Sequence, residues 1–375
     1  MIYFDNGATT WPKPPSVRQS VLEAMERYGA NPGRAGHEMS IATAVMVTQT
    51  RERAAQLFDL PQPEQVIFTQ NCTHGLNIAI KTLVHPGDRV VISGYEHNAV
   101  TRPLHAIPEV EILVARSPLF DRQGMIDSFR QCLDQGADAA ICTHVSNVFG
   151  FILPIQEIAE LCRQREVPLI VDASQSAGVL PLDIQELGAA FVAMPGHKGL
   201  YGPQGTGLLL CNRDPTPILE GGTGSESLKQ SMPQFLPDRL EAGTHNIAGV
   251  AGLLEGLRFL RRRDIRWIAG HESRLIQRMG NGLSRLPGVE VFQASMPKAQ
   301  SGVLSFRIKG RDCEDVGEAL GDRGFALRAG LHCAPEAHRT AGTLETGTVR
   351  ASVSAFNTEM EIDRFLRAIG DMVRR

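Results

Sequence analysis

The stretch Leu169-Ile170-Val171-Asp172-Ala173-Ser174-Gln175 decides the fold class of this chain. Three apolar residues in a row, bounded by a proline and by an aspartate, predict a short strand that is buried on both faces. Apolar residues recur at helical spacing just before it, after Pro154, a residue that favours a helix start. A helix that alternates with a buried strand is typical of a parallel sheet covered by helices.

The same alternation extends through the middle of the chain. Short apolar runs predict further strands at 66–69, 89–93, 110–114, 139–143 and 207–211. The last third differs, with helices expected around 247–263 and 267–285, strands near 289–292 and 303–308, and a final helix with Ile362 and Phe365 inward. We therefore predict an α/β protein with a large domain at 16–245 and a smaller α+β domain at 246–375 that also includes the N-terminal segment 1–15.

Composition and charge exclude several classes of protein. Of 375 residues, 42% are hydrophobic and 21% charged, and the net charge of -3 provides no attraction to nucleic acid or an anionic membrane surface. We see no membrane-length apolar run and no secretory signal. The seven cysteines are scattered and form neither a disulfide framework nor a zinc pattern. We therefore expect a cytoplasmic protein with no metal site and no nucleic acid or membrane partner.

Lysine is rare in this chain, and one lysine has an unusual setting. Only six of the 38 basic residues are lysine. Lys198 stands in Gly196-His197-Lys198-Gly199, directly after the apolar run 190–193, so we expect its amine to be partly desolvated. Desolvation lowers the pKa of an amine and makes it available as a nucleophile. A solvated loop lysine is the competing interpretation.

Asp172 favours the catalytic interpretation of Lys198. An aspartate at the carboxyl end of a buried strand lies where open α/β sheets bind ligands, although it can also cap a helix. Together with a desolvated lysine it fits a site for pyridoxal phosphate (PLP), whose pyridine nitrogen stays protonated beside a carboxylate. The segment 69–75 offers backbone N–H groups at a helix N-terminus for a phosphate, or an ordinary capped turn. His97 follows the strand that ends at Ser93 and adds an imidazole at the same sheet edge.

Seven motifs occur in the order seen in class V PLP enzymes, and together they resemble the cysteine desulfurases and selenocysteine lyases. The motifs are Glu96 to Asn98, Ser146 to Gly150, Asp172 to Gln175, Gly196 to Lys198, Arg239 to Thr244, Arg328 to Ala334 and Val349 to Ser352. The resemblance extends from Tyr3 to Thr358, nearly the whole chain. It implies a PLP-dependent transferase of fold type I, a homodimer whose large domain holds a mostly parallel seven-stranded sheet.

The resemblance also implies roles for single residues. Lys198 would bind PLP covalently, Asp172 would pair with the pyridinium nitrogen, and His97 would stack on the ring and move protons. The remaining implied contacts are Asn147 and Gln175 to the ring substituents, Cys72, Thr73, His197 and the partner subunit's Thr244 to the phosphate, and Arg350 to the substrate carboxylate. His37, in a Gly-rich turn, matches a family region near the substrate, with a structural role as the alternative.

The position of one cysteine indicates which class V reaction to expect. Six cysteines are expected to be small buried residues. Cys333 follows Arg328 and His332 in a segment with little apolar content, so we expect an exposed thiol with a stabilised thiolate. In desulfurases this position holds the nucleophile, which implies conversion of L-cysteine to L-alanine with a persulfide on Cys333. Its spacing of 17 residues to Arg350 resembles the group with a short, ordered loop. An acceptor protein or a small thiol would then take the sulfur.

Departures from the family pattern keep alternatives open, among them Leu331, which precedes His332 where some relatives have a second histidine. Pro195 stands where many relatives have a phosphate-binding Ser or Thr, and His245 stands where proline is frequent. The alternatives are a selenocysteine lyase, another class V lyase or aminotransferase, and a non-catalytic PLP-fold binding protein. The intact Lys198, Cys333 and Arg350 argue against the last of these.

Overall fold

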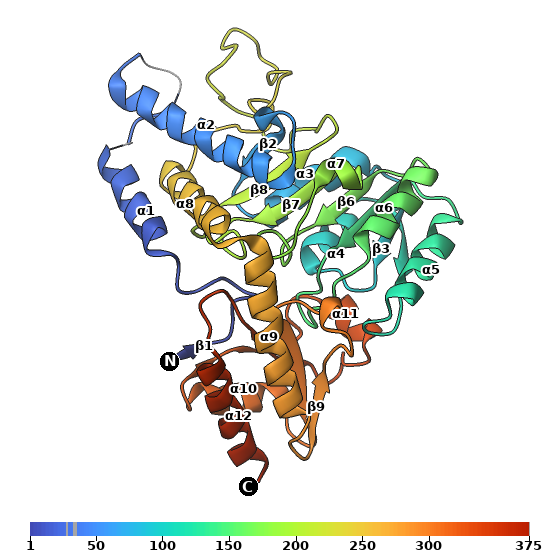
Figure 1. Ribbon diagram of the computed structural model, residues 1–375. Helices are drawn as coiled ribbons and strands as arrows, with labels where there is room; N and C mark the ends of the chain where they lie inside the picture. The colour runs from blue at the N-terminus through green and yellow to red at the C-terminus, as the bar shows by residue number, and fades with distance from the viewer. Residues whose placement is uncertain (28, 33–35, 375) are drawn as a thin grey trace.

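A seven-stranded sheet forms the centre of the larger of two units in the computed structural model, which describes residues 1–27, 29–32 and 36–374 (Figure 1). The strand order is β2-β8-β7-β6-β5-β3-β4, and β8 is antiparallel to both of its neighbours while the other neighbouring pairs are parallel. The strands are β2 (Val66–Thr69), β3 (Arg89–Ser93), β4 (Glu111–Ala115), β5 (Ala139–Thr143), β6 (Leu169–Asp172), β7 (Phe191–Pro195) and β8 (Gly207–Cys211). The expected mostly parallel sheet of seven strands is confirmed.

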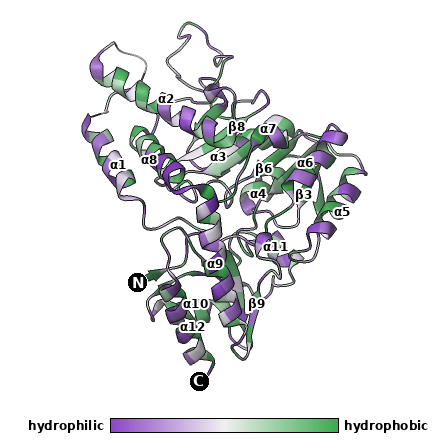
Figure 2. Ribbon diagram, in the orientation of Figure 1, coloured by the Kyte–Doolittle hydropathy of each residue, from purple (hydrophilic) through white to green (hydrophobic). Residues whose placement is uncertain are grey.

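Helices cover both faces of this sheet. On one face, α3 (Cys72–Leu83) and α4 (Asn98–His105) share an apolar core with the strands. The other face packs against α5 (Arg122–Leu133), α6 (Ile155–Gln164), α7 (Ile184–Leu187), the end of α2 (Glu38–Phe58) and α8 (Ile247–Arg263). Figure 2 shows the labelled strands of this sheet as mainly hydrophobic, whereas the helices around them carry both hydrophobic and hydrophilic residues. Helix α1 (Pro15–Arg27) packs with α2 and α8 at the margin.

The smaller unit is built around a four-stranded antiparallel sheet in the order β12-β13-β10-β9. Its elements are α9 (Ile265–Leu283), β9 (Val289–Phe292), β10 (Val303–Ile308), α10 (Cys313–Gly321), β11 (Phe325–Ala326), β12 (Arg328–Gly330), α11 (Pro335–Thr340), β13 (Thr348–Ser352) and α12 (Glu359–Val373). The N-terminal strand β1 (Ile2–Tyr3) pairs with β11. Helix α9 leads down from the larger unit into the smaller one (Figure 1). The domain boundary at residue 246 stays a prediction. Helix α8, which begins just after it, packs on the larger unit.

The parallel strands bring the motif residues to one sheet edge. Because β3, β5, β6 and β7 run in the same direction, the segments after them meet at their carboxyl ends. His97 follows β3, Asn147 follows β5, Asp172 ends β6, and Lys198 follows β7. Among the described residues, no helix is long and apolar enough to span a membrane.

Candidate active site

A cavity of about 110 Å³ lies at this sheet edge, against the first turn of α3. It brings together eight of the nine residues that the sequence assigned to cofactor binding. These are Cys72, Thr73, His97, Asn147, Asp172, Gln175, His197 and Lys198. Residues from five separate segments therefore converge on one cavity, as the motif order predicted.

Lys198 enters the cavity from the loop after β7. Burial lowers the pKa of its amine, and the negative charge of Asp172 opposes that shift. The positive charges of Arg350 and Arg328 lower the pKa further. A larger fraction of the amine is therefore neutral near pH 7 than for a solvated lysine, and the neutral amine is the nucleophilic form.

Asp172 is held so that one carboxylate oxygen remains available. Its side chain is 2% exposed, and Oδ1 accepts hydrogen bonds from the Ser174 amide at 2.9 Å and from the Cys72 thiol at 3.6 Å. Within the described part of the chain, Oδ2 has no hydrogen-bond donor. Asp172 thus combines a fixed orientation with a free acceptor, which suits a protonated ring nitrogen.

His97 caps α4 and is neutral at pH 7. Its Nδ1 accepts a hydrogen bond from the Ala99 amide at 3.0 Å, which assigns the ring proton to Nε2. Burial lowers the pKa of His97 to about 4, although the charge of Asp172 opposes this. A neutral imidazole with one fixed tautomer can pack on an aromatic ring and exchange a proton through Nε2.

The first turn of α3 has backbone N–H groups that could bind a phosphate group. Asn71 caps the helix by accepting from the His74 amide at 2.9 Å. The amides of Cys72 and Thr73 donate no hydrogen bond within the described residues, as expected for the first positions of a helix. His197 adds Nδ1, a buried atom without a hydrogen-bond partner in that part of the chain. Unsatisfied donors at a helix N-terminus favour an anion.

Arg350 lies beside the cavity and is completely enclosed. Its side chain is 1% exposed, and it donates to the Asn147 carbonyl at 3.0 Å and to Asp5 at 2.7 Å. Its buried Nε has no acceptor among the described residues. An arginine that is fixed by two partners and keeps an unused donor is suited to bind a carboxylate.

Cys333 is exposed, whereas the other six cysteines are buried, as the sequence predicted. The Asn98 amide donates to the Cys333 carbonyl at 2.8 Å, and Asn147 donates to the His332 carbonyl at 2.9 Å. His332 and Cys333 have φ angles of 53° and 56°. The Arg328 guanidinium lies 3.6 Å from the Cys333 sulfur. The loop is therefore tied to the larger unit, with a cation beside the thiol.

Burial sets the remaining site cysteine apart from Cys333. Desolvation raises the pKa of the Cys72 thiol well above its usual value, and the charge of Asp172 raises it further. Cys72 therefore stays protonated and contributes to the cavity through its backbone and as a donor to Asp172.

Two predicted residues are not brought to the cavity within this chain. Thr244 is exposed and lines a separate hollow with His74 and Gly205. Its contact with the phosphate bound by a partner subunit therefore stays a prediction. His37 is exposed and caps α2 by accepting from the Ser40 amide at 3.3 Å. Residues 33–35 of its turn lie outside the described residues. The substrate role of His37 also stays a prediction.

The structure shows what surrounds Pro195 and His245, two positions at which the sequence departs from the family pattern. His245 lies 2.5 Å from the carboxylate of Glu241, which in turn forms a buried ion pair with Arg51 of α2. This network anchors the segment that carries Thr244. Pro195 lines the cavity without a hydroxyl, and the neighbouring His197 supplies a polar atom instead.

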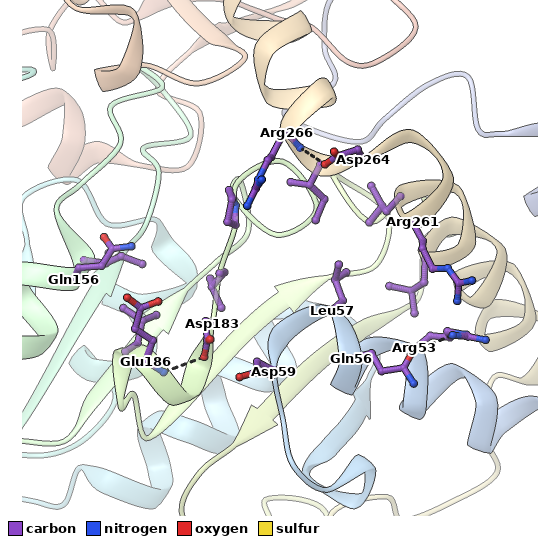
Figure 3. Close-up of a pocket in the computed structure, with 17 residues that line it drawn as sticks. Arg53, Gln56, Leu57, Asp59, Gln156, Asp183, Glu186, Arg261, Asp264 and Arg266 are labelled. Atoms are coloured by element: carbon purple, nitrogen blue, oxygen red, sulfur yellow. Dashed lines mark hydrogen bonds between the residues drawn. The ribbon is translucent and has the colours of Figure 1, made fainter.

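A larger cavity lies elsewhere in the described part of the molecule. About 600 Å³ in volume, it is enclosed by the end of α2, by α7 and by the junction of α8 and α9 (Figure 3). Charged side chains of both signs surround it, including Arg266, Asp183 and Glu186. It contains none of the candidate catalytic, cofactor-binding or substrate-binding residues. Among the described residues, no group of three or more His, Cys, Asp or Glu side chains could hold a metal ion.

Sequence reasoning assigned no role to three polar residues that support the site. Asp5 pairs with Arg350, Lys13 contacts the carbonyl of His197, and Glu96 accepts from the Thr143 amide at 2.7 Å beneath the cavity. Burial raises the pKa of Glu96 to about 8. The rarity of lysine was the available signal for Lys13, while Asp5 acts on a residue 345 positions away.

Comparison with known proteins gives a consistent result. A family model described as aminotransferase class V matches residues 2–365. A probable cysteine desulfurase of Mycolicibacterium paratuberculosis is 34% identical over 98% of this chain and 55% of its own length, so the chain spans about half of that relative. A probable cysteine desulfurase of Methanothermobacter thermautotrophicus is 33% identical over 96% of this chain and 92% of its own length.

Solved structures agree over the whole fold. The apo structure of a cysteine desulfurase from Thermococcus onnurineus has a TM-score of 0.93 at 30% identity and covers 100% of this chain and 94% of its own. The cysteine desulfurase CsdA from Escherichia coli has a TM-score of 0.88 at 27% identity, covering 99% and 94% of the two chains.

Proposed function

The chain belongs to the class V aminotransferase family, and from this premise we propose that it is a PLP-dependent cysteine desulfurase. It would convert L-cysteine to L-alanine and take the sulfur as a persulfide on Cys333. The observation that carries the proposal is the placement of Cys333. It is the exposed cysteine of seven and has Arg328 beside its sulfur, and its carbonyl accepts from the amide of Asn98, which follows His97 of the cavity.

The residues of the cavity fit PLP. Lys198 would hold the cofactor covalently, Oδ2 of Asp172 would accept from the ring nitrogen, and the first turn of α3 with His197 would hold the phosphate. Asn147 and Gln175 would contact the ring substituents. When bound, PLP supplies an electron sink for the carbanion that forms at the substrate α-carbon.

Arg350 would orient the substrate. Its unused Nε–H, together with a second N–H, can bind the α-carboxylate in a two-pronged contact. His97 and Lys198 lie on the cavity wall; burial lowers the pKa of His97 to about 4 and also lowers the pKa of Lys198, so each offers a nitrogen that can take a proton.

Cys333 would remove the sulfur. Attack by its thiolate on the substrate sulfur forms an S–S bond while the carbon–sulfur bond breaks, and the electron pair of the broken bond stays with the carbon. Protonation of that carbon completes L-alanine. The Arg328 guanidinium lies 3.6 Å from the Cys333 sulfur, so a positive charge stands beside the attacking group.

We further propose a cytoplasmic homodimer that passes sulfur to an acceptor protein or a small thiol. Exposed apolar residues on α1, α2 and the segment after β8 support a self-association face. They are Leu22, Met25, Met39, Ile41, Val45, Ile218, Leu219, Leu228 and Phe235. These elements lie on the same side of the larger unit (Figure 1). The exposed Thr244 would reach the partner's phosphate from this side.

The test measures alanine and sulfide released from L-cysteine with PLP present. We expect Cys333→Ser to lower alanine formation by at least about 100-fold, and to abolish the mass increase of one sulfur atom that the wild-type protein acquires. The buried Cys132→Ala is the matched control and should retain both. Full activity of Cys333→Ser would contradict the persulfide mechanism. Activity on L-selenocysteine alone would favour the lyase alternative.

A further inference from the structure

A second lysine lies at the site, next to Lys198 but outside the cavity. Lys13 is partly buried in the N-terminal segment. Its Nζ donates a hydrogen bond to the hydroxyl of Thr10 at 2.6 Å and another to the carbonyl of His197 at 2.6 Å. Lys13 therefore contacts the peptide group that leads directly into Lys198.

Thr10 extends this contact to the far side of Lys198. Its hydroxyl accepts from Lys13 and has a single hydrogen to donate. The carbonyl of Lys198 lies 3.0 Å from that hydroxyl, and the carbonyl of His197 lies 3.2 Å from it. Lys13 and Thr10 together thus hold the two carbonyl groups on either side of the Lys198 α-carbon.

Hydrogen-bond satisfaction does not explain why a lysine is placed here. The His197 carbonyl already accepts from the Thr10 amide at 3.1 Å and from the Thr9 hydroxyl at 3.1 Å. No carboxylate forms an ion pair with Lys13 among the described residues. A buried cation without a partner charge is unfavourable, and such groups gather at functional sites.

The pKa of Lys13 determines at which pH its burial destabilises the folded protein. Burial lowers the pKa of Lys13 to about 7 from 10.5. Between these two pH values the unfolded chain binds more protons, so the folded state is penalised fully below pH 7 and the penalty disappears as pH rises toward 10.5. On the β7 side, Lys13 contacts the carbonyl of His197, whose imidazole has its pKa lowered to about 4 by burial and by the charges of Lys198 and Lys13. On the N-terminal side it faces the neutral hydroxyl of Thr10.

We propose that Lys13 is a positioning residue for the cofactor-binding lysine: with Thr10 it holds the peptide groups that flank Lys198 and so fixes the direction in which the amine enters the cavity. The proposal rests on the proposed function, because it takes Lys198 as the residue that binds PLP. It assigns Lys13 no contact with cofactor or substrate.

The experiment measures how fast PLP attaches to Lys198. Apo-protein at pH 6.5 is mixed with PLP, samples are reduced with borohydride at set times, and the modified fraction is counted by mass spectrometry. We expect Lys13→Met to slow attachment at least about tenfold, because small errors of orientation are costly in bond formation. The exposed Lys81→Met is the control and should attach at the wild-type rate.

Two further measurements separate positioning from a structural role. Thr10→Val removes the hydroxyl at constant shape and should slow attachment as Lys13→Met does, whereas Thr10→Ser should retain the wild-type rate. The thermal midpoint of apo Lys13→Met should equal or exceed that of the wild type, since an unfavourable buried charge has been removed.

The outcomes distinguish this inference from the proposed function. A wild-type protein that attaches no PLP at Lys198 would overturn the proposed function, and this inference with it. Normal attachment in the wild type, with Lys13→Met or Thr10→Val within twofold of it, would overturn this inference alone. If Lys13→Met does not fold, the comparison of Thr10→Val with Thr10→Ser decides.

Discussion

At the scale of single residues, the environment of Arg350 links substrate binding to the N-terminal segment. Burial lowers the pKa of this guanidinium, and the Asp5 carboxylate at 2.7 Å opposes that shift. Asp5 therefore stabilises the charged form of Arg350 and fixes one edge of its planar guanidinium group. The free Nε keeps the other edge available for a ligand.

Two substitutions of Asp5 distinguish the effect of its negative charge from the effect of its hydrogen bond to Arg350. We expect Asp5→Ala to raise KM for L-cysteine about tenfold with kcat within twofold, because a loosened Arg350 binds the carboxylate less well in ground state and transition state alike. Asp5→Asn keeps the acceptor and should lie between Asp5→Ala and the wild type. Steady-state kinetics check both variants, and a fall in kcat at constant KM would contradict this role.

The exposure of a residue within a motif could be predicted from the sequence, but its contacts with residues far away in the chain could not. The exposure of Cys333 followed from the polar segment around it. Asp5 and Lys13 gave no such local signal, because each acts on a group that is distant in sequence and near only after folding.

At the scale of elements, α8 supports the Lys198 loop through glycines. A Cβ atom on Gly256 would lie 2.2 Å from the carbonyl oxygen of Leu200, and one on Gly252 would lie 2.7 Å from the Pro203 ring. The helix backbone therefore packs directly on the segment that follows Lys198. Side chains at these two positions would push the helix away from that segment.

Gly256→Ala tests this close approach. We expect the substitution to destabilise the protein by roughly 2 kcal/mol, since the added methyl meets backbone and cannot be accommodated by a rotamer change. Gly270→Ala in α9 is the matched control, with its nearest neighbour the Arg274 side chain at 3.8 Å. There the gain in helix propensity should stabilise the protein by up to about 1 kcal/mol. Thermal unfolding compares the two, and equal shifts would contradict the packing argument.

Secondary structure was most predictable where burial was two-sided. The strands at 66–69, 89–93, 139–143 and 207–211 have the predicted bounds, because short apolar runs between polar or turn residues are typical of buried strands. The predicted helix at 247–263 also has the predicted bounds. Its packing on α1 and α2 could not be predicted, since helical spacing identifies an apolar face but not the surface it covers.

At the scale of the whole molecule, a buried carboxyl group lies between the two units. Glu272 of α9 lines a small cavity with Lys198 and Tyr201 of the larger unit and with Ser301 and Ser352 of the smaller unit. It is 4% exposed, and burial raises its pKa to about 8 from 4.5. The folded protein therefore holds this proton where the unfolded chain releases it.

This difference makes the stability of the molecule dependent on pH. Between pH 4.5 and 8 the folded state binds more protons than the unfolded state, so the contribution of Glu272 to stability falls as pH rises and levels off above pH 8. Replacing Glu272 by glutamine removes the titration and keeps the shape. The stability difference between Glu272→Gln and the wild type should thus grow by roughly 3 kcal/mol in favour of the variant from pH 5.5 to 8.5.

Thermal midpoints of the two proteins at both pH values measure that growth, and other titrating groups cancel in the difference. Glu318→Gln, at an exposed position of α10, is the control and should show no such trend. A difference for Glu272→Gln that stays constant between pH 5.5 and 8.5 would mean that Glu272 is ionised between the units throughout this range. Burial there would then have to be offset by a cation or by water in the adjoining cavity.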